Sequence, residues 1–100
     1  MVIKFESQYL EKLYTGESQK GKPKYSDAVI TKFKKTVLIL KNVSNTVELS
    51  KFRGLNFESL KGEKSGFFSV RVDKSYRLEF RITKDVIEIV HIEELSKHYQ

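Results

Sequence analysis

The sequence lacks the residues that would build a disulfide or a conventional metal site. It has no cysteine and only two histidines among its 100 residues. Disulfides and thiolate ligands are therefore excluded, and two histidines alone make a poor metal site. We expect neither a metal nor any other cofactor. The single proline and five glycines, beside 39% apolar residues, are typical of a globular chain.

Long hydrophobic runs are also missing. No stretch approaches the roughly 18 consecutive apolar residues that a membrane-spanning helix needs. The first residues, MVIKFES, lack the apolar centre of a signal peptide. We therefore expect a cytoplasmic protein without a membrane partner. The length suits one domain and no repeat or linker divides it, so residues 1–100 are predicted to form a single domain.

Positive charge is what the sequence has in excess. Lysine and arginine number 19 and the acidic residues 13, which gives a formal net charge of +6. An excess of this size indicates a polyanionic partner, although it does not identify one. Nucleic acid is the leading candidate for that partner.

The N-terminal part of the chain predicts a short strand and two helices. Residues 2–5 have the pattern of a strand, and Ser7 is a candidate N-cap for a helix that Gly16 would end. Ser26 is the next candidate N-cap, and the helix that follows it is expected to stop at Asn42. Both helices carry apolar residues at helical spacing, so each should pack one face on a core.

The second helix has a wider apolar stripe than one sheet face requires. Leu38 and Ile39 lie beside the helical spacing that Val29, Phe33 and Val37 establish. This extra width predicts a second contact surface on the helix.

Two stretches near residue 70 alternate apolar and polar side chains. Residues 66–72 and 76–82 both show this period of two, which is typical of half-buried strands. A three-residue loop at 73–75 would pair Phe68 with Phe80 and keep one apolar face continuous. A two-residue loop would turn the apolar side chains of one strand to solvent, so we reject it.

The favoured register places Arg71 directly opposite Arg77. Like charges that face each other across an antiparallel pair are destabilising. Either this face is solvated and partly neutralised by Glu79, or a bound polyanion relieves the repulsion. Phosphate is the anion that the planar guanidinium group matches best.

The next strand, residues 86–92, has two possible registers. A two-residue loop before it would set Glu88 opposite Arg81 and point His91 into the core. A three-residue loop would instead place His91 beside Arg77. We favour the first register, because the second turns the Glu88 carboxylate towards the core. His91 is therefore interpreted as structural.

Together these elements predict an α+β fold. Residues 55–60 are expected to form the first strand of the main sheet, ahead of the three strands described above. The N-terminal strand and the two helices would pack on one face of a twisted antiparallel sheet of about four strands. The other face would be open, lined by arginine and lysine, and suited to single-stranded RNA.

Several short motifs in this order resemble the HigB-like branch of the RelE/ParE toxins. They are LKG at residues 60–62, GFFSVRV at 66–72, YRLEF at 76–80 and SKHY at 96–99. The resemblance spans nearly the whole chain. It implies a RelE-like fold and a cytoplasmic toxin of a type II toxin–antitoxin module.

The resemblance also implies an activity and partners. Members of this branch that cleave mRNA do so on the ribosome without a metal, so the chain is expected to be a ribosome-dependent mRNA endoribonuclease that inhibits translation. In such cleavage the 2′-hydroxyl attacks the adjacent phosphate, which requires a base, cations on the phosphorane and an acid for the leaving 5′-oxygen. The expected partners are a HigA-like antitoxin with a helix-turn-helix fold, the ribosome and mRNA.

The matched motifs imply roles for individual residues. Arg77 and Lys61 would stabilise the developing phosphate charge. His98 and Tyr99 would transfer protons. Glu58 stands where some members carry histidine, and it is either a base that the nearby cations weaken or a surface residue of a strand. The basic residues expected to bind RNA are Lys64, Arg71, Lys74 and Arg81.

Two other functions stay open at this point. A ParE-like toxin with the same fold would inhibit DNA gyrase by binding it, since a fold does not determine a function. A basic module without catalysis would bind RNA and leave it intact. The set of Arg77, Lys61, His98 and Tyr99 favours cleavage.

Overall fold

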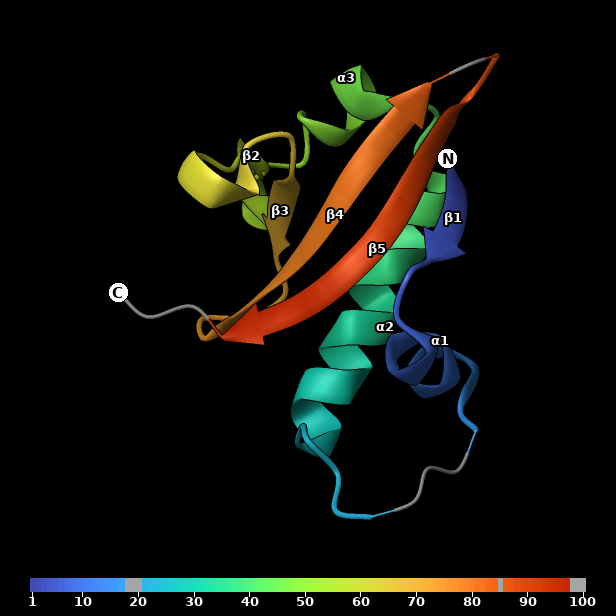
Figure 1. Ribbon diagram of the computed structural model, residues 1–100, viewed down its shortest axis with the longest axis vertical. Coiled ribbons are helices and arrows are strands. Elements are labelled where there is room, and N and C mark those ends of the chain that lie inside the picture. Colours follow the sequence, from blue (N-terminus) through green and yellow to red (C-terminus); the bar gives the residue numbers. More distant parts are fainter. Residues whose placement is uncertain (18–20, 85, 98–100) are drawn as a thin grey trace.

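A computed structural model describes residues 1–17, 21–84 and 86–97 of the chain (Figure 1). Most of the helical residues lie in the first half of the chain and most of the strand residues in the second. Among the described residues, no helix is long and apolar enough to cross a membrane. The elements, in chain order, are β1 (Val2–Phe5), α1 (Gln8–Thr15), α2 (Asp27–Asn42), α3 (Thr46–Leu49), η1 (Arg53–Leu55), β2 (Glu58–Ser59), η2 (Gly62–Lys64), β3 (Phe68–Arg71), β4 (Tyr76–Lys84) and β5 (Glu88–Lys97), where η1 and η2 are 3-10 helices.

The strands form one sheet in the order β1-β5-β4-β3-β2. Strand β1 runs parallel to β5, and the other neighbouring strands are antiparallel. Helix α2 passes behind the sheet in Figure 1 and covers one of its faces, and α1 lies beside α2, next to β1. The expected α+β class is confirmed. The expected sheet of about four antiparallel strands is wrong in detail, because β1 joins as a fifth, parallel strand.

The two helices begin and end where the sequence predicts. The Ser7 hydroxyl accepts a hydrogen bond from the Leu10 amide at 3.2 Å, and the Ser26 hydroxyl accepts one from the Val29 amide at 3.3 Å. Gly16 follows α1 in the left-handed conformation, with φ of 84°, which glycine adopts without a steric cost. Helix α2 ends at Asn42.

Helix α2 supplies the apolar side chains that meet the sheet. Phe33, Val37 and Leu40 are fully buried, and so are Leu78 and Phe80 of β4. The outward residues of α2 behave differently. Ile39 is partly buried against the core, while Leu38 is 48% exposed. An exposed leucine beside the packed stripe is consistent with the second contact surface expected on this helix.

The hairpin between β3 and β4 has the register expected from its alternation. Phe68 pairs with Phe80, and Arg71 lies opposite Arg77. The carboxylate of Asp73 closes the loop by accepting hydrogen bonds from the amides of Ser75 and Tyr76 at 2.8 and 2.7 Å. An aspartate that caps its own turn in this way is a common turn device.

The strand expected at residues 55–60 is mostly absent. Only Glu58–Ser59 pair with β3, and Arg53–Leu55 form a 3-10 turn instead. Asn56 ends that turn with φ of 44°, a left-handed conformation that asparagine tolerates better than most residues. The turn brings the Phe57 ring onto Phe68, with ring centroids 5.4 Å apart.

The register expected for β5 is wrong. Lys84 pairs with Glu88 and Arg81 with His91, so His91 points away from the core and Ile87 is 53% exposed. The core positions of β5 are Val90, Ile92 and Leu95. Ile92 and Leu95 are three residues apart. The pairing of β5 with β4 shifts its register between Glu79 and Phe80 of β4, and this bulge accommodates the extra residue of β5. The strand therefore runs on to Lys97, five residues beyond the expected end at residue 92.

Glu88 joins β5 to the short helix α3. Its carboxylate accepts a hydrogen bond from the Thr46 amide at 3.1 Å and another from the Thr46 hydroxyl. These bonds, led by the one from the hydroxyl, lower the pKa of Glu88. The carboxylate thus satisfies an amide at the start of α3 that has no partner within the helix.

We expect Glu88→Ala to lower the free energy of unfolding at pH 7 by about 1 kcal/mol, because two hydrogen bonds are lost. The pKa of Glu88 is lower in the folded state, so its contribution is present above the ordinary value of 4.5 and is lost as the pH falls through the lowered value. Urea unfolding at pH 7 and pH 3 measures both effects. The exposed Glu63→Ala is the control, and an equal deficit of Glu88→Ala at both pH values would contradict the assignment.

Candidate active site

The face of the sheet opposite α1 and α2 carries the polar side chains of its strands, and we call it the outer face. It was expected to be open, yet Ser69, Arg77 and Glu79 at its centre are only 1%, 9% and 8% exposed. The segment from Asn56 to Lys64 covers them, since both of its end residues bond to this row. The expectation of a fully open face is therefore wrong.

Arg77 is held by neutral acceptors on two segments. Its Nε donates to the Ser69 hydroxyl at 2.8 Å, and its Nη2 donates to the backbone oxygens of Asn56 at 2.5 Å and Ser69 at 3.3 Å. The carboxylate of Glu58 lies 3.6 Å from Nε. Among the described residues Nη1 makes no hydrogen bond. A desolvated guanidinium is thereby fixed in orientation while one nitrogen keeps its donors for a ligand.

The facing arginines Arg71 and Arg77 bond to different parts of the chain. Arg71 is exposed, and its Nε donates to the backbone oxygen of Asp73 at 3.3 Å. Arg77 instead reaches towards Ser69 and Asn56. The repulsion predicted from their register is therefore relieved within the fold, by separate hydrogen bonds to the two guanidinium groups.

Glu79 is bound to a lysine and does not neutralise the arginines. Lys64 Nζ lies 2.6 Å from one carboxylate oxygen of Glu79 and 3.5 Å from Glu94, and the Ser96 hydroxyl donates to the other Glu79 oxygen at 2.7 Å. The hydrogen bond to Glu79 is the main cause of the raised pKa of Lys64. The positive charge of Lys64 is thus largely compensated.

A third cluster on the outer face surrounds Arg81. Its Nε donates to Glu93 at 2.6 Å, and its Nη2 lies 3.7 Å from Glu6. His91 shares a 2.7 Å hydrogen bond with the Thr83 hydroxyl, and its Nδ1 lies 3.7 Å from Glu6. The two carboxylates of Glu93 and Glu6 therefore compensate the charge of Arg81.

In the described part of the chain, no three histidine, aspartate or glutamate side chains are grouped as a metal site.

The structure brings some of the expected site residues together and separates others. Glu58 and Arg77 are in contact, and Lys61 follows on the same segment as the exposed N-cap of η2. No ion pair within residues 1–17, 21–84 and 86–97 involves Lys61, Arg71 or Lys74. His98 and Tyr99 lie outside the described residues. Strand β5 ends one residue after Ser96, which pairs with Arg77.

Sequence reasoning missed two residues that position Arg77. Neither Ser69 nor Asn56 was assigned a role from the sequence. Their contributions come from a buried hydroxyl and a backbone oxygen, and the sequence carries no direct signal for either. The only available hint is that asparagine is enriched in the left-handed conformation that Asn56 adopts.

We expect Arg77→Ala to lower the free energy of unfolding by about 2 kcal/mol, because it leaves the Ser69 and Asn56 acceptors without their donor. Arg71→Ala is the matched control on the facing strand and should change stability by about 0.5 kcal/mol or less, since its side chain is exposed. Urea unfolding of both variants measures the difference. Equal midpoints for the two variants would show that the bonds of Arg77 do not stabilise the fold.

Comparisons with known proteins identify the family and the fold of the chain. Residues 3–94 match the model of a family described as the RelE-like toxin of the type II toxin–antitoxin system HigB. A comparison with curated proteins found no match. Among solved structures, a YoeB/ParE toxin from Agrobacterium tumefaciens is similar at 18% identity and a TM-score of 0.62, over 99% of this chain and all of that one.

Two further structures have the same fold. One is a YoeB–YefM complex from Staphylococcus aureus, at 20% identity and a TM-score of 0.61, covering 99% of this chain and 98% of that one. The other is YafQ from E. coli, at 13% identity and a TM-score of 0.59, covering 96% of this chain and 91% of that one. At these identities the structures support the fold alone. The family match spans nearly the whole chain, and the chain therefore belongs to the HigB-like family of RelE-like toxins of type II toxin–antitoxin systems.

Proposed function

We propose that this toxin is an endoribonuclease that cleaves mRNA on the ribosome, without a metal, by attack of the RNA 2′-hydroxyl. The observation that carries the proposal is the contact between the Glu58 carboxylate and the Arg77 guanidinium at 3.6 Å on the outer face. It brings a proton acceptor and an oriented cation within reach of one phosphate. Membership of a toxin family supports a toxic activity of this kind.

Each chemical step then has a candidate residue. Glu58 takes the proton of the 2′-hydroxyl, whose oxygen forms a new bond to phosphorus. Arg77 Nη1 and Lys61 stabilise the negative charge that develops on the phosphorane. The bond from phosphorus to the 5′-oxygen breaks, and His98 or Tyr99 supplies the proton to that oxygen. The products are a 2′,3′-cyclic phosphate and a free 5′-hydroxyl.

The surroundings of Arg77 suit this role. Its bonds to Ser69 and Asn56 fix the plane of the guanidinium before substrate arrives, so little reorganisation is needed during the reaction. The side chain of Glu58 is 52% exposed and therefore accessible to RNA, while that of Arg77 is 11% exposed. An electrostatic contact to phosphate is stronger from such a partly desolvated position.

The proposed partners follow from the same function. The toxin would bind mRNA and the ribosome through its cationic residues and would be neutralised by an antitoxin with a HigA-like helix-turn-helix fold. The similar structure from Staphylococcus aureus is a complex named YoeB–YefM, which supports a protein partner for this chain.

We expect Glu58→Gln to slow cleavage by about 100-fold or more while RNA binding is retained, because the amide cannot accept the 2′-hydroxyl proton. Glu94→Gln is the matched control, since that carboxylate is 58% exposed on the same face and pairs with Lys64 rather than with Arg77. The measurements are growth arrest and primer-extension mapping of transcripts after induction. Cleavage by folded Glu58→Gln at the parental rate would remove Glu58 from the chemistry. Intact transcripts with a DNA-damage response in the parent would favour gyrase inhibition instead.

We expect the RNA affinity to depend most on the cations without carboxylate partners. Lys61→Ala, Arg71→Ala and Lys74→Ala should each reduce the salt slope by about 0.7, the value for one phosphate contact to a single strand. Arg81→Ala should reduce it less, because Glu93 and Glu6 already compensate that charge. Fluorescence anisotropy with a labelled RNA oligonucleotide, at several salt concentrations, measures the slopes. An equal or larger effect of Arg81→Ala would contradict this ranking.

A further inference from the structure

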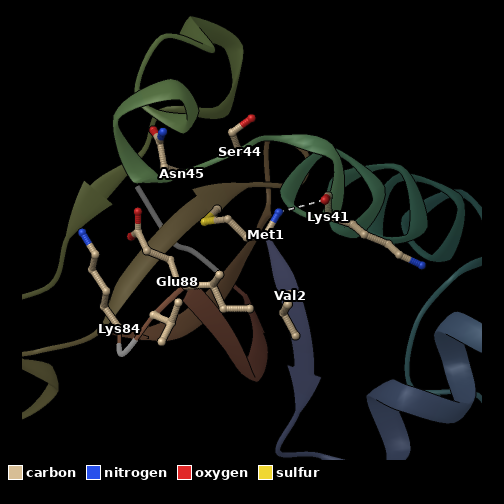
Figure 2. Close-up of a pocket in the computed structure, with 9 residues that line it drawn as sticks. Met1, Val2, Lys41, Ser44, Asn45, Lys84 and Glu88 are labelled. Carbon is tan, nitrogen blue, oxygen red and sulfur yellow. Dashed lines mark hydrogen bonds between the residues drawn. The ribbon is translucent and has the colours of Figure 1, made fainter.

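Two adjoining cavities lie beside β1. This strand forms the edge of the sheet opposite to β2, which carries Glu58 of the proposed active site. The first has a volume of about 450 Å³ and reaches from Met1 to the hairpin between β4 and β5 (Figure 2). The second has a volume of about 440 Å³ and continues along β1 to Tyr14 of α1. Both are lined by Met1, Val2 and Lys41, so they form one continuous groove, which we call the β1 groove.

The β1 groove borders a strand edge without a partner. Strand β1 is the last in the sheet order and pairs only with β5 among the described strands. The second cavity is lined by Ile3 and Phe5 of this strand as well as by Val37 of α2. An unpaired edge presents backbone donors and acceptors to which a further extended segment can add.

Apolar side chains that line the groove are exposed to solvent. At the β4–β5 hairpin Val86 is 88% exposed and Ile87 is 53% exposed, and Val2 of β1 is 46% exposed. All three line the first cavity. Exposed apolar residues gathered around a groove are typical of a protein-binding surface.

The charges around the groove indicate an acidic occupant. Figure 2 shows Lys84 and Lys41 on the two sides of Met1. No ion pair involves either lysine in the described parts of the chain. The carboxylate that lines the first cavity, Glu88, is bound to Thr46 and also interacts electrostatically with Lys84. The rim of the groove carries two lysines against this one carboxylate, so its net charge is positive.

We propose that the β1 groove binds an extended segment of the cognate antitoxin, an inference that rests on the proposed toxin–antitoxin pairing. The segment adds to the free edge of β1, inserts apolar side chains beside Val2 and Ile87, and places carboxylates near Lys41 and Lys84. A second copy of this chain fits less well, because it would set lysines against lysines and a charge of +6 against another of +6.

This location separates antitoxin binding from RNA cleavage. Strand β1 is at one end of the sheet order and β2, which carries Glu58, is at the other. A segment in the groove thus leaves the Glu58–Arg77 pair uncovered. Substitutions in the groove should change antitoxin affinity and leave the toxicity of the unbound toxin unchanged.

The test uses the purified full-length toxin and the purified antitoxin encoded beside its gene, with affinities measured by isothermal titration calorimetry. Ile87→Glu and Lys41→Glu should each weaken binding by about tenfold or more, because one buries a charge in the groove and the other reverses the charge at its rim. Lys32→Glu is the control, since Lys32 lies nine residues earlier in α2, about two and a half turns, on the opposite side of the helix from Lys41. It should change the affinity by less than about twofold.

Three outcomes would overturn the proposal. The first is unchanged affinity for both groove variants, when thermal melts show that they are folded. The second is an equal loss for Lys32→Glu, which would indicate general charge attraction. The third is a dimer of the free toxin in light scattering that Ile87→Glu dissociates, which would assign the groove to a second copy. None of these readouts depends on RNA cleavage, so failure of the nuclease assignment would be seen separately, as intact transcripts.

Discussion

The burial of one guanidinium group, that of Arg77, constrains the outer face of this toxin. A cation that is only 9% exposed must have partners, and here they are the Ser69 hydroxyl, the Asn56 backbone and the Glu58 carboxylate. These groups lie on β3, on the turn after η1 and on β2, so one side chain ties three segments to β4. Folding alone therefore orients the Arg77 guanidinium, before any phosphate binds.

Much of the fold could be predicted because its signals are local. The caps Ser7 and Ser26 and the period-two alternation of β3 and β4 depend on neighbouring residues alone, and the structure confirms them. Strand β5 could not be predicted in the same way. Its core residues Ile92 and Leu95 are three apart, which breaks the period of two unless a bulge absorbs one residue. The sequence offers no independent sign of that bulge.

The candidate site was predictable only in part, for a related reason. Alternation shows which face a side chain is on, so it correctly placed Arg71 and Arg77 opposite each other on the face away from the helices. It does not show what covers that face. The cover comes from the segment around Asn56 and from Lys64, through contacts with β4 residues that lie 21 and 15 positions away along the chain. Sequence reasoning therefore found the charged residues but mistook a partly buried network for an open surface.

The parallel pairing of β1 explains why the two edges of the sheet differ. Strands joined by hairpins are antiparallel, as β3, β4 and β5 are, and the Glu58–Arg77 pair links β4 to β2 at one edge of this sheet. Strand β1 comes first in the sequence and can pair in parallel with β5, because α1 and α2 intervene before the chain returns to the sheet. Those helices then flank β1, and the groove they leave beside it is apolar. One edge thus carries the fixed Arg77 charge that we propose binds an RNA phosphate, and the other carries the apolar groove and two lysines that we propose bind the antitoxin.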